Sequence, residues 1–387
     1  MNKIVSNIIE KVKTNGDSAI TFFTEKYDGL KLLPKNFKVS DNEILSAFKS
    51  VDKNFLNSII LAKENIEVFQ NKIFPKSTII KKSGIVLKHI FKPLDSVGIY
   101  IPGGRFSYPS TILMTAIPAK IAGVKKIIIT TPFKNLSNEV LATAKICGVN
   151  EIYRIGGAQA IASLAYGTET IPKVDKIVGP GNAYVTEAKK QVYGDVGIDM
   201  LAGPSEILII ADESVKMQFI TEDLKAQCEH DKNSKAVLIS MSKRLTKTIK
   251  KNISLFKKQI KIINVDSIVQ AIKIANQIAP EHLEIMTKNP QYIADKVKNA
   301  GAVFIGNYSP VALGDYFAGP SHVLPTGRNA RFSSGLSVYD FLKSSSYIHY
   351  KKSALKKSAS SIIKLANTEG LSKHAESIKV RVNDSNG

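Results

Sequence analysis

The feature of this sequence that most constrains its fold is a theme that recurs along the chain. An apolar run is followed by a glycine break and then by a segment whose apolar residues recur at helical spacing. Between residues 97 and 197 the theme occurs in SVGIYIPGG/PSTILMTAIPAKIAGV, KKIIITTPF/EVLATAKICGV, EIYRIGG/AQAIASLAYG and KIVGPG/NAYVTEAKKQVYG. Because strand and helix alternate in this way where crossover helices join parallel strands, we predict an α/β lobe with a parallel sheet.

The same theme resumes at residue 206 and predicts a second lobe. Its apolar runs are EILIIAD, KAVLIS, KIINV, LEIMT and GAVFIGN, with helical patterns between them. A chain of 387 residues is also too long for one simple core. We therefore predict the α/β class, with two incomplete Rossmann-like lobes of similar plan.

The flanking segments have other patterns. Residues 1–75 carry helical spacing, and STIIKK, a Ser83-Gly84 turn and IVLKHIF predict a β-hairpin. After residue 325 the chain is rich in Ser, Lys and Ala, with helical stretches around residues 339–343 and 353–367. The predicted division is a first α/β lobe with a helical N-terminal region (1–97 plus 206–331), a second, dinucleotide-binding α/β lobe (98–205) and a C-terminal helical tail (332–387). Such a tail either packs on its own body or reaches a partner subunit.

The chain is strongly basic, with 54 Lys+Arg against 33 Asp+Glu and a net charge of +21. That charge alone would suit a polyanionic partner such as nucleic acid. However, the lysines are scattered singly and in pairs, and no basic run is interleaved with stacking aromatic residues. A solvated, lysine-rich surface is the favoured interpretation, and we expect no nucleic-acid partner.

Other features indicate the compartment. Two cysteines, Cys147 and Cys228, cannot form a disulfide framework, and the N-terminus lacks the apolar core of a secretion signal. No stretch approaches 18 uncharged apolar residues, so we expect no membrane-spanning helix. The cytoplasm is the expected location.

Glycine-rich loops follow several predicted strands of the 98–205 lobe: Pro102-Gly103-Gly104, Gly156-Gly157 and Gly179-Pro180-Gly181-Asn182. None matches G-x-G-x-x-G, and any one of them alone is explained by a tight strand-to-helix turn. However, open α/β sheets bind ligands at the carboxyl ends of their strands, and helix N-termini there hold anions. Three such loops together predict a dinucleotide or phosphate site.

Polar residues in AQCEHD, GDYFAGP and LSKHAE supply candidates for a metal site. Gln227 and His230 lie three apart at a predicted helix end and share one face, although a surface Gln-x-x-His is often incidental. With Asp315 and His374 they make a nitrogen and oxygen donor set suited to Zn²⁺. Sequence spacing does not show whether the four converge.

Glu281 and His282 follow Pro280 at a predicted helix-to-strand junction. A carboxylate beside an imidazole suits proton transfer near neutral pH, although an ion-pairing Glu beside a capping His explains these two residues equally well. Cys228 offers another route, a thiolate that attacks an aldehyde and is activated by His230. A Cys within a helix is more often a small apolar filler, which we favour here.

Long, ordered blocks of this sequence resemble histidinol dehydrogenases, from VKTNGDSAITFFTEKYDG near the start to EGLSKHAESIKVRV near the end. Between them the resemblance runs through SVGIYIPGG, LMTAIPAKIAGVKKIIITTPF, GGAQAIASLAYGTETIPKVDKIVGPGNAYVTEAKKQV, GIDMLAGPSEILIIAD, QCEHD, APEHLE, GDYFAGPSHVLPT and RFSSGLSVYDFLK. It therefore covers nearly the whole chain.

The resemblance implies the NAD-dependent, four-electron oxidation of L-histidinol to L-histidine through a bound aldehyde. It implies one zinc per subunit that grips the imidazole and amine of the substrate, and a homodimer in which the C-terminal tail is swapped so that His374 comes from the other subunit. The implied zinc ligands are Gln227, His230, Asp315 and His374. His282 looks like the base that removes the alcohol proton, and Glu281 like the base that activates water to hydrate the aldehyde.

The remaining implied site residues contact substrate or dinucleotide. Ser205, Glu369 and the zinc ligands resemble substrate-binding positions together with His282, and His322 is a further candidate. Tyr100, Gln159 and Asn182 resemble NAD-contacting positions, each beside one of the glycine-rich strand ends.

Two other hypotheses are kept. A zinc-dependent dehydrogenase of another amino alcohol would differ in specificity at Ser205 and Glu369. A basic, non-catalytic binding protein would use the positive charge for polyanions, but it would not need Glu281, His282 and four candidate metal ligands.

Overall fold

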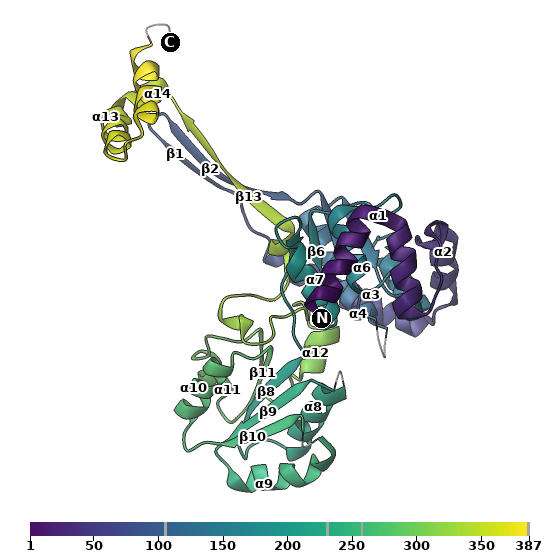
Figure 1. Ribbon diagram of the computed structural model, residues 1–387. Helices are drawn as coiled ribbons and strands as arrows, with labels where there is room; N and C mark the ends of the chain where they lie inside the picture. Colours follow the sequence, from purple (N-terminus) through teal and green to yellow (C-terminus); the bar gives the residue numbers. More distant parts are fainter. Residues whose placement is uncertain (104–106, 230–231, 257, 385–387) are drawn as a thin grey trace. The chain divides into compact units, whose positions relative to one another are not determined.

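The computed structural model describes residues 1–103, 107–229, 232–256 and 258–384, and the chain divides into two units (Figure 1). The first unit comprises Met1–Ile73 and Leu94–Phe341, and the second comprises Phe74–Pro93 and Leu342–Gly387. Each unit is thus assembled from segments that are separated in the sequence.

The first parallel sheet of unit 1 has the strand order β5-β4-β3-β6-β7. Its strands in chain order are β3 (Ser96–Tyr100), β4 (Lys126–Thr130), β5 (Glu151–Tyr153), β6 (Lys176–Val178) and β7 (Gly197–Ile198). The helices between them are α4 (Pro109–Ala122), α5 (Asn138–Ile146), α6 (Gly157–Tyr166) and α7 (Ala183–Val192).

The second parallel sheet of unit 1 has the strand order β10-β9-β8-β11-β12. Its strands in chain order are β8 (Glu206–Ala211), β9 (Lys235–Ser240), β10 (Ile260–Asn264), β11 (His282–Met286) and β12 (Ala302–Ile305). Its helices are α8 (Met217–Glu229), α9 (Lys243–Asn252), α10 (Ile268–Ile278) and α11 (Pro290–Ala294). Both sheets follow the order third, second, first, fourth, fifth, which is the Rossmann order without its last strand, and the predicted pair of incomplete Rossmann-like lobes is confirmed.

Strand β8 shows why the apolar runs predicted these strands. Ile207 and Ile209 pack in one buried cluster with α8 and α9, whereas Leu208 and Ile210 pack in another cluster with α10. Successive side chains of a strand point to opposite faces, so a strand covered on both faces needs apolar residues at every position. A continuous run such as EILIIA satisfies that requirement.

The N-terminal helices are α1 (Asn2–Asp28), α2 (Asp41–Ser50) and α3 (Lys53–Lys72). Val5, Ile20 and Phe23 of α1 are buried with side chains of α6 and α7, while α2 packs on α5 and α3 on α4. These helices therefore cover the sheet of residues 96–198, whereas the sequence pattern groups residues 1–97 with residues 206–331. Apolar spacing shows that a helix has a buried face, but it does not show which sheet covers that face.

The second unit contains an antiparallel sheet with the order β1-β2-β13 and two helices. Its elements are β1 (Thr78–Lys82), β2 (Ile85–Pro93), β13 (Leu342–Tyr350), α13 (Lys352–Thr368) and α14 (Ser372–Asn383). The predicted hairpin is confirmed as β1 and β2, but the predicted helical stretch around residues 339–343 is instead the short 3-10 turn Val338–Phe341 followed by β13. Swapping of the tail between subunits stays a prediction.

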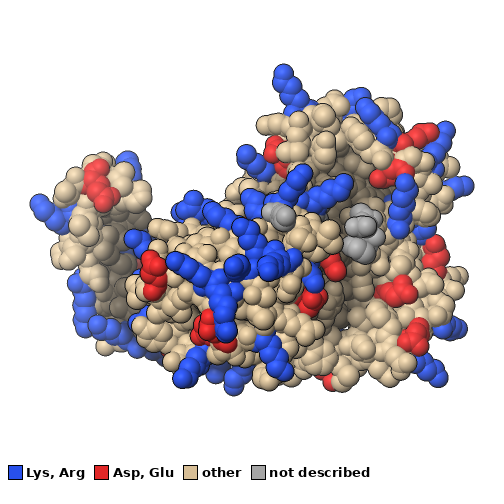
Figure 2. Space-filling view, turned by 90° about the horizontal axis from the view of Figure 1, so that it is seen from below, with Lys and Arg blue, Asp and Glu red and all other residues tan. Residues whose placement is uncertain are grey.

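Short 3-10 turns also lie in unit 1, at Pro34–Asn36, Phe133–Asn135, Ser254–Phe256 and Asn329–Arg331. Within the described ranges, no helix has the length and apolar character needed to cross a membrane. Figure 2 shows lysine and arginine side chains over much of the face that it draws, with acidic side chains among them. Basic and acidic side chains interspersed in this way are typical of the solvated, lysine-rich surface that we predicted from the sequence.

Candidate active site

The glycine-rich loops lie at the carboxyl edge of the first sheet, after β3, β5 and β6 (Figure 1). The Tyr100 side chain is buried at the end of β3, and its hydroxyl oxygen accepts a hydrogen bond from the backbone N–H of Gly157, 3.1 Å away, at the start of α6. Burial raises the pKa of Tyr100 to about 12, so the hydroxyl keeps its proton at neutral pH. Tyr100 therefore joins the end of β3 to the loop after β5, while Gly104 lies outside the described residues.

The other two predicted dinucleotide contacts lie on the neighbouring helices. Gln159 is buried in the first turn of α6. Asn182 is exposed and precedes α7, where its Oδ1 accepts hydrogen bonds from the backbone N–H groups of Tyr184 and Val185 at 3.0 and 3.1 Å. Asn182 is therefore the N-cap of α7, a role for which Asn is well suited.

These loops are in direct contact with one another. A Cβ atom at Gly156 would lie 2.3 Å from Pro132 Cγ, and one at Gly179 would lie 2.2 Å from the carbonyl oxygen of Tyr100. Both approaches are too close for any residue with a side chain. The structure thus brings the predicted loops together at the switch point between β3 and β6, where sheets of this order bind ligands.

The Glu281 and His282 pair lies at the amino edge of the second sheet. His282 is the first residue of β11, four residues after the end of α10, so the predicted helix-to-strand junction is confirmed. The neighbouring strand β8 begins with Glu206, whose backbone N–H donates to Glu281 Oε2 at 2.9 Å and whose carbonyl oxygen lies 3.1 Å from His282 Nδ1. The two backbone polar groups of Glu206 therefore hold both side chains.

This contact fixes the tautomer of His282. A carbonyl oxygen can only accept a hydrogen bond, so Nδ1 carries the proton in the neutral imidazole and Nε2 keeps its lone pair. Nε2 faces Asp315 Oδ1 across 3.9 Å. Asp315 lies on the short helix α12 (Val311–Tyr316). The lone pair of His282 is thus directed to the side where the predicted metal ligand lies.

The carboxyl groups around His282 are poorly solvated. Burial raises the pKa of Glu281 well above its ordinary value, and the charges of Glu206 and Asp315 act in the same direction. Burial also raises the pKa of Asp315 to about 7. Perturbed carboxyl groups of this kind gather at functional sites, where a cation or a substrate balances their charge.

The predicted zinc ligands are divided by the architecture. Gln227 lies on α8 and is 3% exposed, and its Nε2 makes no hydrogen bond to any described residue. His230 falls outside the described residues. His374 lies in the first turn of α14 in the second unit, where it is exposed, as is Glu369 at the end of α13. In the described part of the chain, no three His, Cys, Asp or Glu side chains are grouped as metal ligands.

His322 joins the helix of Asp315 to α4, which covers the first sheet. Its Nδ1 lies 2.9 Å from the carbonyl oxygen of Asp315, and its Nε2 lies 3.3 Å from Thr111 Oγ1 on α4. Ser205, the other predicted substrate contact of unit 1, directly precedes Glu206 and is half-buried. Each residue is therefore linked to the Glu281 and His282 pair through one other residue. His322 is linked through Asp315, and Ser205 is linked through Glu206.

Cys228 does not suit the thiolate hypothesis. Its side chain is buried in the apolar cluster beneath α8, and burial raises the pKa of its thiol. The preferred interpretation of Cys228 as an apolar filler is therefore supported.

A second acid pair, Asp223 and Glu284, is not predicted from the sequence. Glu284 lies on β11 two residues after His282, is 1% exposed, and accepts a hydrogen bond from the backbone N–H of Val311, the first residue of α12, at 2.8 Å. Burial and the nearby Asp223 on α8 raise the pKa of Glu284 to about 8, while burial raises that of Asp223 to about 6. A single carboxyl group inside the apolar run HLEIM is the signal that could have revealed this pair.

Glu284→Gln should make folding stability less dependent on pH. The folded protein holds the Glu284 proton more tightly than the unfolded chain does, so the wild type loses stability as pH rises from the ordinary value of 4.5 to about 8. Glutamine keeps an acceptor for Val311 and removes the charge. The free energy of unfolding of each protein is measured with urea at about pH 5 and about pH 9. We expect the difference between variant and wild type to shift in favour of the variant by about 2 kcal/mol at the higher pH. Parallel pH curves for the two proteins would contradict this assignment.

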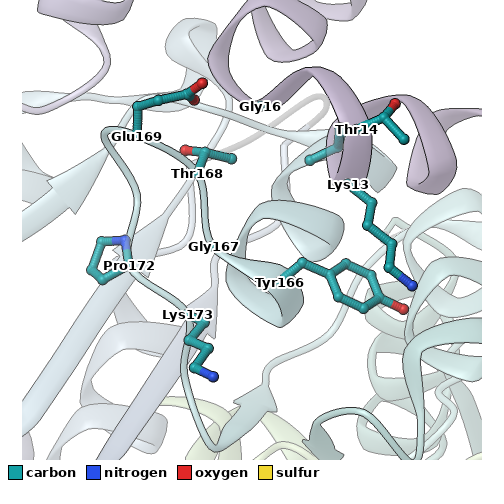
Figure 3. Close-up of a pocket in the computed structure, with 10 residues that line it drawn as sticks. Lys13, Thr14, Gly16, Tyr166, Gly167, Thr168, Glu169, Pro172 and Lys173 are labelled. Carbon is teal, nitrogen blue, oxygen red and sulfur yellow. The ribbon is translucent and has the colours of Figure 1, made fainter.

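A surface cavity of about 370 Å³ lies away from these residues (Figure 3). It is lined by α1 around the kink at Gly16 and by the segment between α6 and β6, with Lys13, Tyr166 and Lys173 among its side chains. Because this segment leads into β6, the cavity lies at the amino edge of the first sheet, opposite the glycine-rich loops. None of the predicted site residues lines it.

Comparison with known proteins gives a consistent result. The histidinol dehydrogenase family model matches residues 1–382. A histidinol dehydrogenase from Clostridium acetobutylicum is 50% identical over 98% of this chain and 92% of its own length, and one from Oceanobacillus iheyensis is 48% identical over 99% and 93%. The crystal structure of histidinol dehydrogenase from Elizabethkingia anophelis superposes with a TM-score of 0.94 at 36% identity, covering 100% of this chain and 93% of that one.

A more distant likeness concerns the fold alone. An acetylating aldehyde dehydrogenase from Geobacillus thermoglucosidasius gives a TM-score of 0.52 at 12% identity, covering 90% of this chain and 97% of that one. The family match over almost the full length is far more specific, and it agrees with the resemblance seen in the sequence blocks. This chain belongs to the histidinol dehydrogenase family, whose members are oxidoreductases of histidine biosynthesis.

Proposed function

We propose that this enzyme carries out the NAD-dependent, four-electron oxidation of L-histidinol to L-histidine through bound L-histidinaldehyde. The observation that carries the proposal is the arrangement of Glu281 and His282 on the backbone N–H and carbonyl oxygen of Glu206, with Asp315 across from the imidazole. It provides two bases at one point, as two successive oxidations at one carbon require. The aldehyde stays in the site between the steps, which protects it from reaction with amines.

His282 is the base of the first oxidation. Its Nδ1 is held by the Glu206 carbonyl oxygen, so Nε2 accepts the hydroxyl proton of the substrate while the same carbon gives up a hydride to the dinucleotide. Glu281 then removes a proton from water as that water adds to the aldehyde. The hydrated aldehyde loses a hydride to a second NAD and its remaining proton to solvent through these bases, which yields the carboxylate. The Glu206 N–H keeps the Glu281 carboxyl group in position throughout.

We further propose that one zinc per subunit is held by Gln227, His230 and Asp315 together with His374 of the partner subunit. The residues fit such an ion: an amide oxygen, a carboxylate oxygen and imidazole nitrogens are donors that zinc accepts, and burial raises the pKa of Asp315, whose charge a bound cation would balance. When bound, zinc would orient the imidazole and amine of the substrate. Ser205, Glu369 and His322 would complete the substrate contacts.

The dinucleotide is placed at the carboxyl edge of the first sheet, at Tyr100, Gln159 and Asn182. The support for this placement is the Rossmann-like strand order and the contact between the loops at its switch point. The backbone segment from Asp199 to Glu206 runs from this edge to the Glu281 and His282 pair, since Asp199 contacts Gly179 and Glu206 contacts Glu281.

The second unit supports the proposal of a homodimer. Among its described residues, the buried hydrophobic side chains are only those of Ala354, Ala359, Ala366 and Ala375. Several of its large apolar side chains are exposed, including Ile79, Ile80, Ile348, Leu365 and Val380, with Ile348 at 74%. Exposed apolar surface on a unit with so small a core calls for a partner surface. We also place the enzyme in the cytoplasm, in keeping with two free, buried cysteines.

The test is NADH formation from L-histidinol by purified protein, before and after treatment with a chelator and after zinc is added back. We expect two NADH per L-histidinol, loss of activity on chelation and recovery with zinc alone. Metal content measured on the same samples links activity to occupancy. Zinc-loaded protein that forms no NADH from L-histidinol would refute the proposal, and turnover of a different amino alcohol would redirect it to another substrate.

A further inference from the structure

A buried ion pair lies directly beneath the loop after β6. Lys189 on α7 and Asp199, which follows β7, pair through Nζ and Oδ1, and their side chains are 2% and 0% exposed. Burying two opposite charges is costly, and well-packed apolar residues of similar size are often at least as stabilising. The contacts of this pair therefore indicate what it does beyond stabilising the fold.

Those contacts converge on one residue, Gly179. Asp199 Oδ2 accepts a hydrogen bond from the Gly179 N–H at 2.7 Å, and Lys189 Nζ donates to the Gly179 carbonyl oxygen at 3.0 Å. Asp199 Oδ1 also accepts from the Met200 N–H at 2.6 Å. The ion pair thus grips Gly179 through both of its backbone polar groups.

Gly179 is a position of the loop that only glycine can occupy without strain. Its φ of 110° lies in the left-handed region, and a Cβ atom there would be 2.2 Å from the carbonyl oxygen of Tyr100. Gly181, two residues on, packs as closely on Val185 of α7, and Asn182 then caps that helix. The position of Gly179 therefore sets the position of Asn182 relative to Tyr100.

We infer that Lys189 and Asp199 are positioning residues for the dinucleotide: they hold the Gly179–Asn182 loop in the conformation that receives NAD. This inference rests on the proposed NAD site at the carboxyl edge of the first sheet. Neither side chain reaches the surface, so both act through the loop.

The test is the double variant Lys189→Met/Asp199→Asn, which removes both charges and leaves an acceptor for the Gly179 N–H. A small misplacement of a binding group has large effects, and we expect the KM for NAD to rise about tenfold or more. The KM for L-histidinol, measured at saturating NAD, and the zinc content should stay within about twofold of wild type. A general loss of structure would instead change all three quantities together.

The matched control is Asp340→Asn. It breaks the ion pair with Lys176, which begins β6 at the opposite, amino edge of the sheet. This variant removes a charge from another ion pair of the same sheet and should leave the KM for NAD unchanged. If the double variant proves too unstable to assay, Lys189→Met alone, which leaves Asp199 with its Gly179 and Met200 N–H donors, should show the same selective rise.

Two results would overturn the inference, and they are distinguishable. A folded double variant with an unchanged KM for NAD, or with both KM values raised in parallel, would refute the positioning role alone. Wild-type protein that neither binds nor reduces NAD would refute the proposed function, and this inference with it.

Discussion

His282→Asn should lower kcat for L-histidinol by about 10²- to 10⁴-fold, the usual contribution of a positioned base. The asparagine amide can still donate to the Glu206 carbonyl oxygen, as Nδ1 does, so the backbone of β8 and β11 keeps this contact. What is lost is the Nε2 lone pair that faces Asp315. The change therefore removes the base and leaves its support in place.

The measurement is steady-state NADH formation, with NAD binding and thermal unfolding followed on the same protein. His349→Asn is the matched control, because His349 is exposed on β13, and it should keep wild-type kcat. A His282→Asn enzyme that retained more than about a tenth of wild-type kcat would exclude His282 as the base, because the loss would then be below the range for such a group.

Glu281→Gln should separate the two oxidations. The glutamine oxygen still accepts from the Glu206 N–H, but the side chain can no longer take a proton from water. We expect the yield in a single turnover to fall from two NADH per site towards one, and the oxidation of added L-histidinaldehyde to slow by about 10²- to 10⁴-fold. Trapping the aldehyde with a carbonyl reagent would show that it accumulates.

Thermal stability distinguishes the loss of the Glu281 base from misfolding of the Glu281→Gln variant. Burial raises the pKa of Glu281, so the folded state binds its proton more tightly than the unfolded chain does, and stability is lost as pH rises above the ordinary value of 4.5. Removing the charge should therefore leave Tm unchanged or higher at neutral pH. Glu213→Gln, at an exposed carboxylate beyond the other end of β8, should alter neither step. Equal slowing of both oxidations would contradict a separate role for Glu281.

The strands of both sheets could be predicted because burial on two faces demands continuous apolar runs, as in EILIIA of β8. The Ser83-Gly84 turn likewise marks the hairpin of β1 and β2. Strand β13 escaped prediction because its sequence, LKSSSYIHY, is exposed along nearly its whole length and so lacks alternating polarity. The polarity pattern of a strand depends on which of its faces is buried, and hardly any of β13 is buried.

For the candidate site, the residues could be predicted from the sequence, but their contacts could not. Glu281 and His282 were identified by residue type, but the backbone groups that hold them belong to Glu206, and only the pairing of β8 with β11 reveals these contacts. Glu284 and Lys189 are buried charged residues whose partners, Asp223 and Asp199, lie on other elements. Long-range pairing decides these contacts, and local sequence carries little of that information.

The pairing of β2 with β13 has a consequence for how the chain is made. Residues 94–341 lie between these two strands, so the hairpin of β1 and β2 leaves the ribosome long before its third strand exists. Until residues 342–350 emerge, one edge of β2 has backbone groups that any other strand could pair with. Because closing so long a loop is entropically costly, we expect the intervening residues to fold first and bring the two strands near each other. During synthesis, the hairpin is therefore the part of the nascent protein most exposed to pairing with another chain.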